Sequence, residues 1–486
     1  MSIQEVLELS DPANFIDNRW QPGAGPTRPV RNPADPADLL PGVPDSTPSE
    51  VDAAVESATR AARHWAATPA PQRGDVLRRW NELIGEHAEE LAVLMTREMG
   101  KPLAESRGEI GRARLELEYA MGEATRLHGA TIPSRMPEQL VYTQRGPLGV
   151  VGAITPWNFP AVAPIRKLGP ALAAGCPVVL KPAEETPLTA LALATLLRDA
   201  GLPDGVVNVV CGRGSVVGAH LAAHPKIAGV SFTGSTTVGH EIAASVARRL
   251  GVVQLELGGK NAAYVHSADD LGRVVEQITS AAVQTSGQRC TAISRVIVQN
   301  EIADELVRLI TEKYAALTVG PGLDAAIQVG PLVNEQQRDR VADYVRKGLE
   351  QGATRTTPNR AVPNGPYFAP TVLDHVTPDM VVAREEIFGP VLTVLRVSDV
   401  DEAITVANDS DYGLASVVFS REIDVAMKFA REISTGMVHI NHGTISQPHV
   451  PFGGVHGSGL GEFSIGHTST EFFTRLKTVY LSPRIP

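Results

Sequence analysis

Apolar positions between residues 47 and 126 recur at the spacing of an α-helix. Thr47, Pro48 and Glu50 mark a helix start, because Thr and Glu three residues apart form a capping box and proline suits the first helical turn. The apolar residues that follow predict one buried face, made of Val51, Ala54, Val55, Ala58, Ala62 and Trp65. The same periodicity predicts further helix over roughly Arg73 to Met99 and Leu103 to Arg126.

From Gly149 the pattern changes to short apolar runs that alternate with helical segments. These runs predict strands at Gly149–Ile154, Pro177–Leu180, Val206–Val210, Gly229–Phe232 and Val252–Leu257. A helix is expected from Thr186-Pro187 to Ala200-Gly201, since the cap residue, the proline and the final glycine suit its two ends. This alternation predicts an α/β fold whose mostly parallel sheet binds ligands at the carboxyl ends of its strands.

A second α/β block is expected from Ala262 to about Asn441. Its predicted strands are Arg295–Val298, Val391–Val397, Ser416–Phe419 and Val438–Ile440. A chain of 486 residues is long enough for two to four domains at about 150 residues each. We therefore expect at least two domains, each with its own sheet.

Three segments lie outside this alternation. Residues 1–48 are rich in proline and glycine and predict an extended arm with turns. Gln139–Gln144 alternates between apolar and polar residues and predicts a strand, and Thr474–Leu481 predicts a strand that closes the chain. We expect the strand at 139–144, which stands between a helical and an α/β region, to contact another copy of the chain.

Charge and cysteine content restrict the kinds of partner. The net charge is -10 and no long run of one sign occurs, so neither nucleic acid nor an anionic membrane is an expected partner. The three cysteines, Cys176, Cys211 and Cys290, are too few for a disulfide scaffold. The first residues lack the basic and apolar regions of a signal peptide. These features predict a cytoplasmic protein that takes a small-molecule substrate, with no metal site.

One cysteine stands in a sequence suited to nucleophilic chemistry. Cys290 follows Arg289 in the stretch Thr285-Ser286-Gly287-Gln288-Arg289-Cys290-Thr291. A neighbouring cation lowers the pKa of a thiol, and small residues let a substrate approach the backbone. An ordinary half-buried cysteine is an equally good interpretation of these residues alone.

Two loops at predicted strand ends carry polar side chains that catalysis or nucleotide binding uses. Asn158 follows the first strand of the alternating region, where its amide is suited to stabilise an oxyanion. Lys181 and Glu184 follow the next strand, where they are suited to hold the hydroxyls of a ribose. For each loop taken alone, a polar cap or an exposed ion pair is the more common interpretation.

Two further loops add a phosphate site and a base. The segment 232–239 runs through Gly234 and Ser235 into a helix, whose N-terminal amides attract a pyrophosphate. Its glycine spacing differs from the usual dinucleotide fingerprint, so this signal is weak by itself. Glu256 ends an apolar strand before two glycines, which predicts a carboxyl group with a raised pKa that serves as a general base.

Taken in order, these motifs resemble the aldehyde dehydrogenase superfamily over almost the whole chain. The resemblance is carried by Pro156-Trp157-Asn158-Phe159-Pro160, Lys181-Pro182-Ala183-Glu184, Phe232-Thr233-Gly234-Ser235, Glu256-Leu257-Gly258-Gly259-Lys260, Gly287-Gln288-Arg289-Cys290, Glu385-Glu386-Ile387-Phe388-Gly389-Pro390 and Pro451-Phe452-Gly453-Gly454. Any one of these is weak evidence alone, whereas their common order is specific.

The resemblance implies the architecture and the role of each site residue. It implies an atypical Rossmann NAD(P)-binding domain (1–124 and 148–258), a catalytic domain (259–452) and an oligomerisation element (125–147 and 468–486) that supports a homodimer or homotetramer. Cys290 would be the nucleophile, Glu256 the general base and Asn158 the oxyanion donor. The cofactor, NAD in preference to NADP, would contact Thr155, Pro156, Trp157, Lys181, Glu184, Gly234, Ser235, Leu257, Glu386 and Phe388.

The substrate is less constrained than the chemistry. Arg166 and Arg289 stand at channel positions of the family, and the sequence around Arg166 is similar to the succinate-semialdehyde branch. Paired arginines favour a short aldehyde with a carboxylate, although pairing with protein carboxylates is an equal alternative for each arginine. His456 and Glu462-Phe463 depart from the usual residues near the channel mouth, which leaves the choice of substrate open. The alternative is a neutral aliphatic or aromatic aldehyde.

Other functional classes fit the sequence less well. Dehydrogenases that transfer the acyl group to coenzyme A generally lack a base at the position of Glu256. A non-catalytic relative would be expected to have lost Cys290 or Glu256, and both are present. A cysteine hydrolase unrelated to this family would not account for the nucleotide-binding loops. We therefore predict a non-acylating aldehyde dehydrogenase.

Overall fold

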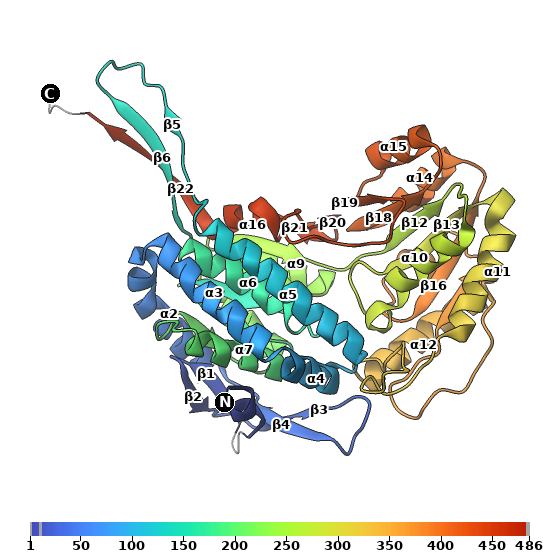
Figure 1. Ribbon diagram of the computed structural model, residues 1–486, viewed down its shortest axis with the longest axis horizontal. Coiled ribbons are helices and arrows are strands. Elements are labelled where there is room, and N and C mark those ends of the chain that lie inside the picture. The colour runs from blue at the N-terminus through green and yellow to red at the C-terminus, as the bar shows by residue number, and fades with distance from the viewer. Residues whose placement is uncertain (1, 9–11, 483–486) are drawn as a thin grey trace.

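The chain forms two α/β lobes and a projecting β arm. A computed structural model describes residues 2–8 and 12–482 (Figure 1). The lobe drawn in blue and green contains an eight-stranded sheet, and the lobe drawn in yellow and orange contains a seven-stranded sheet. None of the described helices combines the length and the apolar character that are needed to cross a membrane.

The first lobe is built on a mostly parallel sheet with strand order β2-β1-β9-β8-β7-β10-β11-β21. Its strands are β1 (Ala13–Ile16), β2 (Arg19–Pro22), β7 (Val151–Ile154), β8 (Val178–Lys181), β9 (Val207–Val209), β10 (Gly229–Thr233), β11 (Val252–Glu256) and β21 (Gly459–Leu460). The strands from β7 to β11 are parallel to one another, while β1, β2 and β21 pair antiparallel. The predicted parallel sheet is therefore confirmed.

Helices cover both faces of this sheet. They are α1 (Ser2–Leu7), α2 (Pro48–Ala67), α3 (Ala70–Glu86), α4 (Ala88–Met99), α5 (Leu103–Glu123), α6 (Val162–Ala174), α7 (Pro187–Asp199), α8 (Ala219–Ala223) and α9 (Thr236–Ala247). One face packs on α2, α8 and α9, and the other on α6 and α7, which are backed by α3, α4 and α5. Because both faces are buried, the strands are continuous apolar runs.

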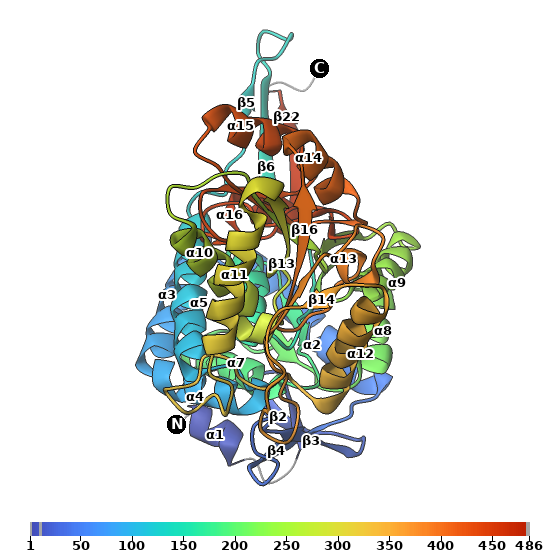
Figure 2. The same ribbon diagram turned by 90° about the vertical axis from the view of Figure 1, so that its right-hand side faces the viewer.

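The second lobe has a sheet of strand order β14-β15-β16-β13-β12-β18-β19, in which only β14 is antiparallel to its neighbour. Its strands are β12 (Asn261–Val265), β13 (Ile293–Gln299), β14 (Thr354–Arg355), β15 (Thr371–Asp374), β16 (Val391–Val397), β18 (Ala415–Phe419) and β19 (Met437–Ile440). Its helices are α10 (Leu271–Val283), α11 (Asn300–Ala316), α12 (Glu335–Glu350), α13 (Val381–Arg384), α14 (Val400–Asn408) and α15 (Ile423–Glu432). Figure 2 shows this lobe toward the viewer.

The arm is a separate three-stranded antiparallel sheet. β6 (Leu140–Pro147) pairs with β5 (Thr131–Ile132) and with β22 (Thr474–Leu481). The sheet therefore joins strands that are far apart in the sequence. Figure 1 shows the arm projecting away from both lobes. Short elements complete the chain: β3 (Thr27–Arg31), β4 (Leu39–Pro44), β17 (Tyr412–Gly413), β20 (Val455–His456), α16 (Gly466–Phe473), a π-helical turn at Gly214–Gly218 and a 3-10 turn at Gln284–Gly287.

One local prediction is wrong. The stretch 1–48 was expected to be an extended arm, but it contains α1 and four strands, and β1 joins the first sheet beside β9. The apolar side chains of this short strand are buried, and Phe15 packs edge-on against Trp20, so tertiary packing outweighs the turn-rich sequence. The predicted helical stretch from Arg73 to Met99 is confirmed as two helices, α3 and α4, which meet at His87. Residues 1 and 9–11 lie outside the described residues.

A buried carboxylate fixes the start of α7, directly after the loop that carries Lys181 and Glu184. Glu98 on α4 accepts hydrogen bonds from the backbone N–H groups of Leu188 (2.9 Å) and Thr189 (3.0 Å) and from the Thr189 hydroxyl. A negative charge at a helix N-terminus is favourable. Burial nevertheless raises the pKa of Glu98 to about 7, against the effect of these donors.

We expect Glu98→Gln to lower the stability of the first lobe. An amide offers one acceptor oxygen to these donors in place of two, so a buried N–H loses its partner at a cost of about 1–3 kcal/mol. The urea midpoint, measured by circular dichroism at pH 8 where the carboxylate prevails, should therefore decrease. Glu90→Gln on the exposed side of α4 is the matched control. Equal midpoints for both variants would contradict this role.

Candidate active site

The parallel register of the first sheet places four predicted loops side by side. β7 lies between β8 and β10, and β10 lies next to β11. The carboxyl ends of these strands are followed by Thr155, by the loop from Lys181, by Gly234 and by the segment after Glu256. Because parallel strands end at one edge of a sheet, the polar groups of these loops face a common space.

Cys290 comes from the other lobe, on the segment between α10 and β13. A hydrogen bond joins the two lobes here, since the Asn158 side chain donates from Nδ2 to the carbonyl oxygen of Gln288 (2.8 Å). Asn261, on β12, holds the same segment through a second hydrogen bond, which Nδ2 donates to the carbonyl oxygen of Cys290 (2.7 Å). The structure therefore brings the predicted nucleophile and the predicted oxyanion donor together, and the Asn158 amide retains a second N–H.

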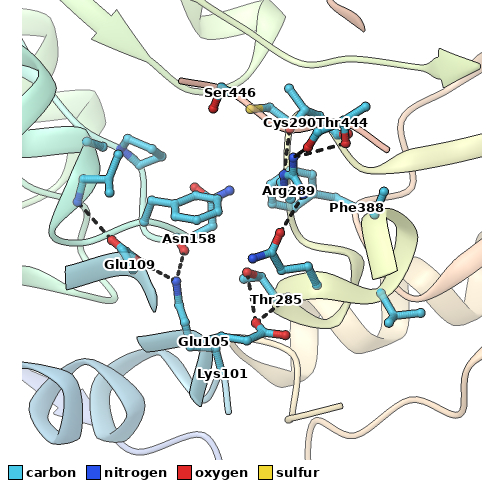
Figure 3. Close-up of a pocket in the computed structure, with 18 of the residues that line it drawn as sticks. Lys101, Glu105, Glu109, Asn158, Thr285, Arg289, Cys290, Phe388, Thr444 and Ser446 are labelled. Atoms are coloured by element: carbon cyan, nitrogen blue, oxygen red, sulfur yellow. Dashed lines mark hydrogen bonds and ion pairs between the residues drawn. The ribbon is translucent and has the colours of Figure 1, made fainter. Parts of the chain in front are cut away.

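A cavity of about 940 Å³ contains most of the predicted site. The predicted residues that line it are Pro156, Trp157, Asn158, Arg166, Gly234, Ser235, Glu256, Leu257, Arg289, Cys290, Glu386 and Phe388. The rings of Trp157 and Phe388 meet edge-on with centroids 5.4 Å apart, which joins the two lobes across the cavity. Figure 3 shows Asn158, Arg289, Cys290 and Phe388 around this space.

The remaining predicted cofactor residues lie outside the cavity lining. Thr155 is buried and its N–H donates to the carbonyl oxygen of Lys181 (3.1 Å). The buried Lys181 ammonium donates to the carbonyl oxygen of Pro182 (2.6 Å), and burial lowers its pKa. The Glu184 carboxylate pairs with Arg28 (3.1 Å) and accepts the N–H of Gly214 (2.7 Å). These contacts define a second polar region beside the first sheet.

Burial controls the ionisation of the two central groups. The sequence led us to expect that Arg289 lowers the pKa of Cys290, but burial outweighs that charge and raises the pKa to about 11. Burial also raises the pKa of Glu256 to about 7, although the cations of Arg166 and Lys167 oppose the rise. Glu256 Oε1 accepts the N–H of Ser464 (3.3 Å), and Oε2 is buried without a partner in the described part of the chain. Burial therefore keeps Cys290 as a thiol and leaves Glu256 partly protonated near neutral pH.

A lysine that the sequence did not single out lies behind Glu256. Lys167 is buried on α6, and its ammonium donates to the hydroxyls of Ser231 and Thr233 (2.9 Å each). Burial lowers its pKa to about 7. The signal in the sequence was a second basic residue beside Arg166 on a helix that is otherwise apolar, since lysine is seldom fully buried without a partner.

The two predicted arginines differ in how their donors are used. Arg166 forms a two-point contact with Glu116 through Nε (3.0 Å) and Nη2 (2.7 Å), and its guanidinium lies 4.6 Å from the ring centroid of Phe452. Among the described contacts its Nη1 has no hydrogen-bond partner. Arg289 donates from every nitrogen to a protein oxygen, namely those of Thr291, Gln284 and Thr444. Arg166 therefore has a free donor group, whereas Arg289 is engaged.

Helix α5 contributes charged residues that the sequence analysis missed. Glu105, Glu109, Arg112 and Glu116 recur every three or four positions, so they share one helix face. The first three line the cavity. Arg112 donates to Glu116 (2.9 Å) and to the carbonyl oxygen of Ser446, while its buried Nη2 has no partner within the described structure. The charged stripe was the signal in the sequence, but an exposed helix face would have the same pattern.

The residues that depart from the family pattern lie away from the cavity lining. His456 on β20 contacts the Ser434 hydroxyl through Nε2 (2.6 Å). The carbonyl oxygen of Phe463 accepts a hydrogen bond from Gln254 (3.5 Å). Neither His456, Glu462 nor Phe463 is among the residues that line the cavity.

Comparisons with known proteins identify the family of this chain. The model of the aldehyde dehydrogenase family matches residues 20–479. The chain is 38% identical to the α-ketoglutaric semialdehyde dehydrogenase of Bacillus subtilis, over 98% of this chain and 99% of that protein. It is 39% identical to the NADP(+) succinate-semialdehyde dehydrogenase of Escherichia coli, over 92% and 93%.

A solved structure supports the same assignment. Betaine aldehyde dehydrogenase of Staphylococcus aureus, in complex with NAD+, is similar with a TM-score of 0.95 and 33% identity over 99% of this chain and 97% of that one. The resemblance inferred from the motifs and the predicted fold class are both confirmed. The chain belongs to the aldehyde dehydrogenase family.

Proposed function

We propose that this protein oxidises a short aldehyde with an anionic group to the carboxylic acid, with NAD(P)+ as the oxidant. The observation that carries this proposal is one cavity that combines Cys290, Asn158 and Glu256 with the cationic pair Arg112 and Arg166. The named B. subtilis and E. coli relatives are semialdehyde dehydrogenases, which supports an anionic substrate. Succinate semialdehyde or a close homologue fits best.

Cys290 would begin the reaction by adding to the aldehyde carbon. An aldehyde does not release hydride until a nucleophile makes its carbon tetrahedral, and a thiolate does this. With a pKa near 11 the thiol needs a base, and Glu256, whose pKa is about 7, is suited to take the proton. The free N–H of the Asn158 amide and the backbone N–H of Cys290 would stabilise the resulting oxyanion.

NAD(P)+, when bound, would supply the hydride acceptor, and loss of hydride from the Cys290 adduct would leave a thioester on the sulfur. After Glu256 has released the proton of Cys290 to solvent, it would deprotonate a water that attacks this thioester. Cleavage of the C–S bond would release the carboxylic acid and the Cys290 thiolate, to which Glu256 would return the proton taken from the water. The buried Oε2 of this carboxylate has no hydrogen-bond partner within the described residues, so its lone pairs are available to accept a proton. The presence of this base is why we favour hydrolysis over transfer to coenzyme A.

The residues near the first sheet fit a dinucleotide. Gly234 and Ser235 precede the N-terminus of α9, where backbone amides favour a pyrophosphate, and a Cβ on Gly234 would collide with the ring of Phe232 at 2.4 Å. Lys181 and Glu184 would hold the adenosine ribose, while Glu386 and Phe388 would hold the nicotinamide end. Thr155, Pro156, Trp157 and Leu257 would form the walls between these ends.

The cationic side of the cavity would hold the anionic end of the substrate. Glu116 is shared by Arg112 and Arg166, so the cluster retains a positive charge, and each arginine has a nitrogen without a partner among the described residues. Guanidinium groups bind carboxylates with directed hydrogen bonds. Arg289 would contribute its charge only, because all its nitrogens already donate to protein oxygens.

We also propose the domain boundaries and domain roles that the family pattern implies. Residues 1–124 and 148–258 would form the NAD(P)-binding domain and residues 259–452 the catalytic domain. Residues 125–147 and 468–486 would mediate a homodimer or homotetramer, although residues 483–486 lie outside the described residues. The exposed Leu140, Leu476 and Tyr480 on the arm support this role, because apolar side chains on a projecting sheet are suited to an interface.

Cys290→Ala should abolish turnover while cofactor binding remains, because only the nucleophile is lost. Glu256→Gln should slow the steps that use this base, namely deprotonation of Cys290 and, most visibly, thioester hydrolysis. In the wild type, activity should rise with pH through about 7, because Glu256 must be deprotonated to act as the base, and the variant should lose this rise. Steady-state and pre-steady-state NADH formation measure these steps. Near-normal turnover in either variant would overturn the assignment.

Cofactor preference should depend on Glu184 and its partner Arg28. We expect a higher kcat/KM with NAD than with NADP, because the Glu184 carboxylate repels a 2′-phosphate. Arg28→Ala should increase this preference, since Arg28 offsets that charge, and Glu184→Gln should decrease it. Dissociation constants of NADH and NADPH from fluorescence titration provide a second measurement. A wild type that favours NADP would show that the carboxylate does not exclude the phosphate.

Substrate charge should matter through Arg166. The wild type should prefer succinate semialdehyde to butanal, and Arg166→Met should reduce kcat/KM for the anionic substrate by about 1.5–3 kcal/mol, roughly tenfold to a hundredfold. Arg112→Met should act in the same direction. Arg289→Met serves as the comparison, because its engaged donors predict similar losses for both substrates. Equal losses in all variants, or a wild-type preference for butanal, would exclude a carboxylate-binding cluster.

A further inference from the structure

The turn that leads to Cys290 has an unfavourable backbone conformation. Thr285, Ser286 and Gly287 are consecutive residues in the left-handed region, with φ of 57°, 56° and 73°. This region is disfavoured for residues with a Cβ, and most of all for a β-branched residue such as threonine. Such a turn persists only where its surroundings hold it, so the contacts of these residues identify what keeps the nucleophile in place.

One of these contacts comes from helix α5 in the other lobe. Glu105, in the first turn of α5, accepts the backbone N–H of Thr285 at 2.7 Å and the Thr285 hydroxyl at 3.4 Å (Figure 3). Burial raises the pKa of Glu105 to about 7, while the hydrogen bonds from Thr285 oppose this rise because they favour the carboxylate. Its Oε2 is directed at the turn and is therefore a poor candidate for a second general base.

The same region of the first lobe also holds the loop of Asn158. Lys101, immediately before α5, donates from Nζ to the backbone carbonyl oxygen of Asn158 (2.7 Å) and pairs with Glu109 (2.5 Å). Glu109 in turn accepts the N–H groups of Ala161 (2.9 Å) and Val162 (3.0 Å). Figure 3 shows Lys101 between Glu109 and Asn158, on the same side of the cavity as Glu105.

The two lobes meet closely where these residues lie. A Cβ on Gly330 would lie 2.2 Å from the carbonyl oxygen of Gly100, so this contact excludes any side chain. The N–H of Leu103 donates to the carbonyl oxygen of Gly322 (2.8 Å), and the Ser286 hydroxyl donates to that of Gly330 (2.8 Å). The start of α5, the second lobe and the strained turn are thus packed together, which leaves Glu105 little freedom to move.

We propose that Glu105 is a positioning residue that holds the turn 285–287, so that the Cys290 thiol stays aligned with the oxyanion donor Asn158. Lys101 performs the corresponding task on the Asn158 loop. The start of α5 therefore keeps in register two reacting groups that belong to different lobes. This inference rests on the proposed role of Cys290 as nucleophile.

The alternative is that Glu105 only stabilises the fold. A purely structural role predicts that activity falls only as far as the folded fraction falls. Positioning predicts a different result, because turnover requires the thiol, the oxyanion donor and the bound aldehyde to be aligned, whereas a small alkylating reagent requires only an accessible thiol. The chemical reactivity of Cys290 therefore distinguishes the two roles.

The experiment compares wild type, Glu105→Ala and Glu105→Gln, with Glu118→Gln on the exposed side of α5 as the control. The kcat for succinate semialdehyde and the rate of alkylation of Cys290 by iodoacetamide, followed by peptide mass spectrometry, are measured for each. Glu105→Ala should lose about tenfold to a hundredfold in kcat, since misplacement by about 1 Å has effects of that size. Alkylation of Cys290 should stay within about threefold of wild type or become faster.

Glu105→Gln should recover part of the lost kcat, because its amide oxygen still accepts the Thr285 N–H. The buried Cys176 and Cys211 report unfolding, since they should remain unmodified in every folded variant. The proposal is overturned if Glu105→Ala keeps a wild-type kcat, or if its kcat and Cys290 alkylation fall together. Should Glu105→Ala not fold, the same two outcomes in Glu105→Gln decide the question. Turnover by Cys290→Ala would instead overturn the proposed function, whatever Glu105 does.

Discussion

The hydrogen bond from Asn158 to the backbone of Gln288 joins the two halves of the site. The rest of the structure depends on the alignment of the two lobes at this bond. Neither lobe contains a complete set of reacting groups. The first sheet supplies the proposed oxyanion donor and the proposed base at the ends of β7 and β11, which flank β10, whereas the second lobe supplies the thiol. A contact between lobes therefore determines whether these groups form one site, and hydrogen bonds have the narrow geometry that this requires.

Desolvation is the second feature that the site groups share. Glu256, Lys167, Glu386 and Lys260 all have pKa values moved toward 7, the acids from below and the lysines from above, and burial is the main cause for each. A group whose pKa lies near neutrality gives and takes protons readily at physiological pH. Burial also raises the pKa of Cys290, as it does for the acids, so the thiol depends on a base to become a thiolate.

The sequence was informative where one short motif determines one local structure. The strand ends that carry Asn158, Lys181, Gly234 and Glu256 were located correctly, because apolar runs and the loops after them are local signals. The charged face of α5 was missed for the opposite reason. Glu105 lies 180 residues from Thr285, and Arg112 lies 334 residues from Ser446, so only folding shows that these side chains face inward. Likewise, nothing local indicated that β1 would join the sheet beside β9.

The left-handed turn at Thr285, Ser286 and Gly287 has a consequence for how the protein responds to heat and to engineering. The strain in this turn is offset by the contacts that hold it, so a change that loosens those contacts should reduce activity while both sheets are still intact. Glycine or asparagine at position 285 or 286 would relieve the strain and raise the melting temperature, but it would also widen the range of thiol positions. In this part of the chain, stability and catalytic precision are therefore in opposition.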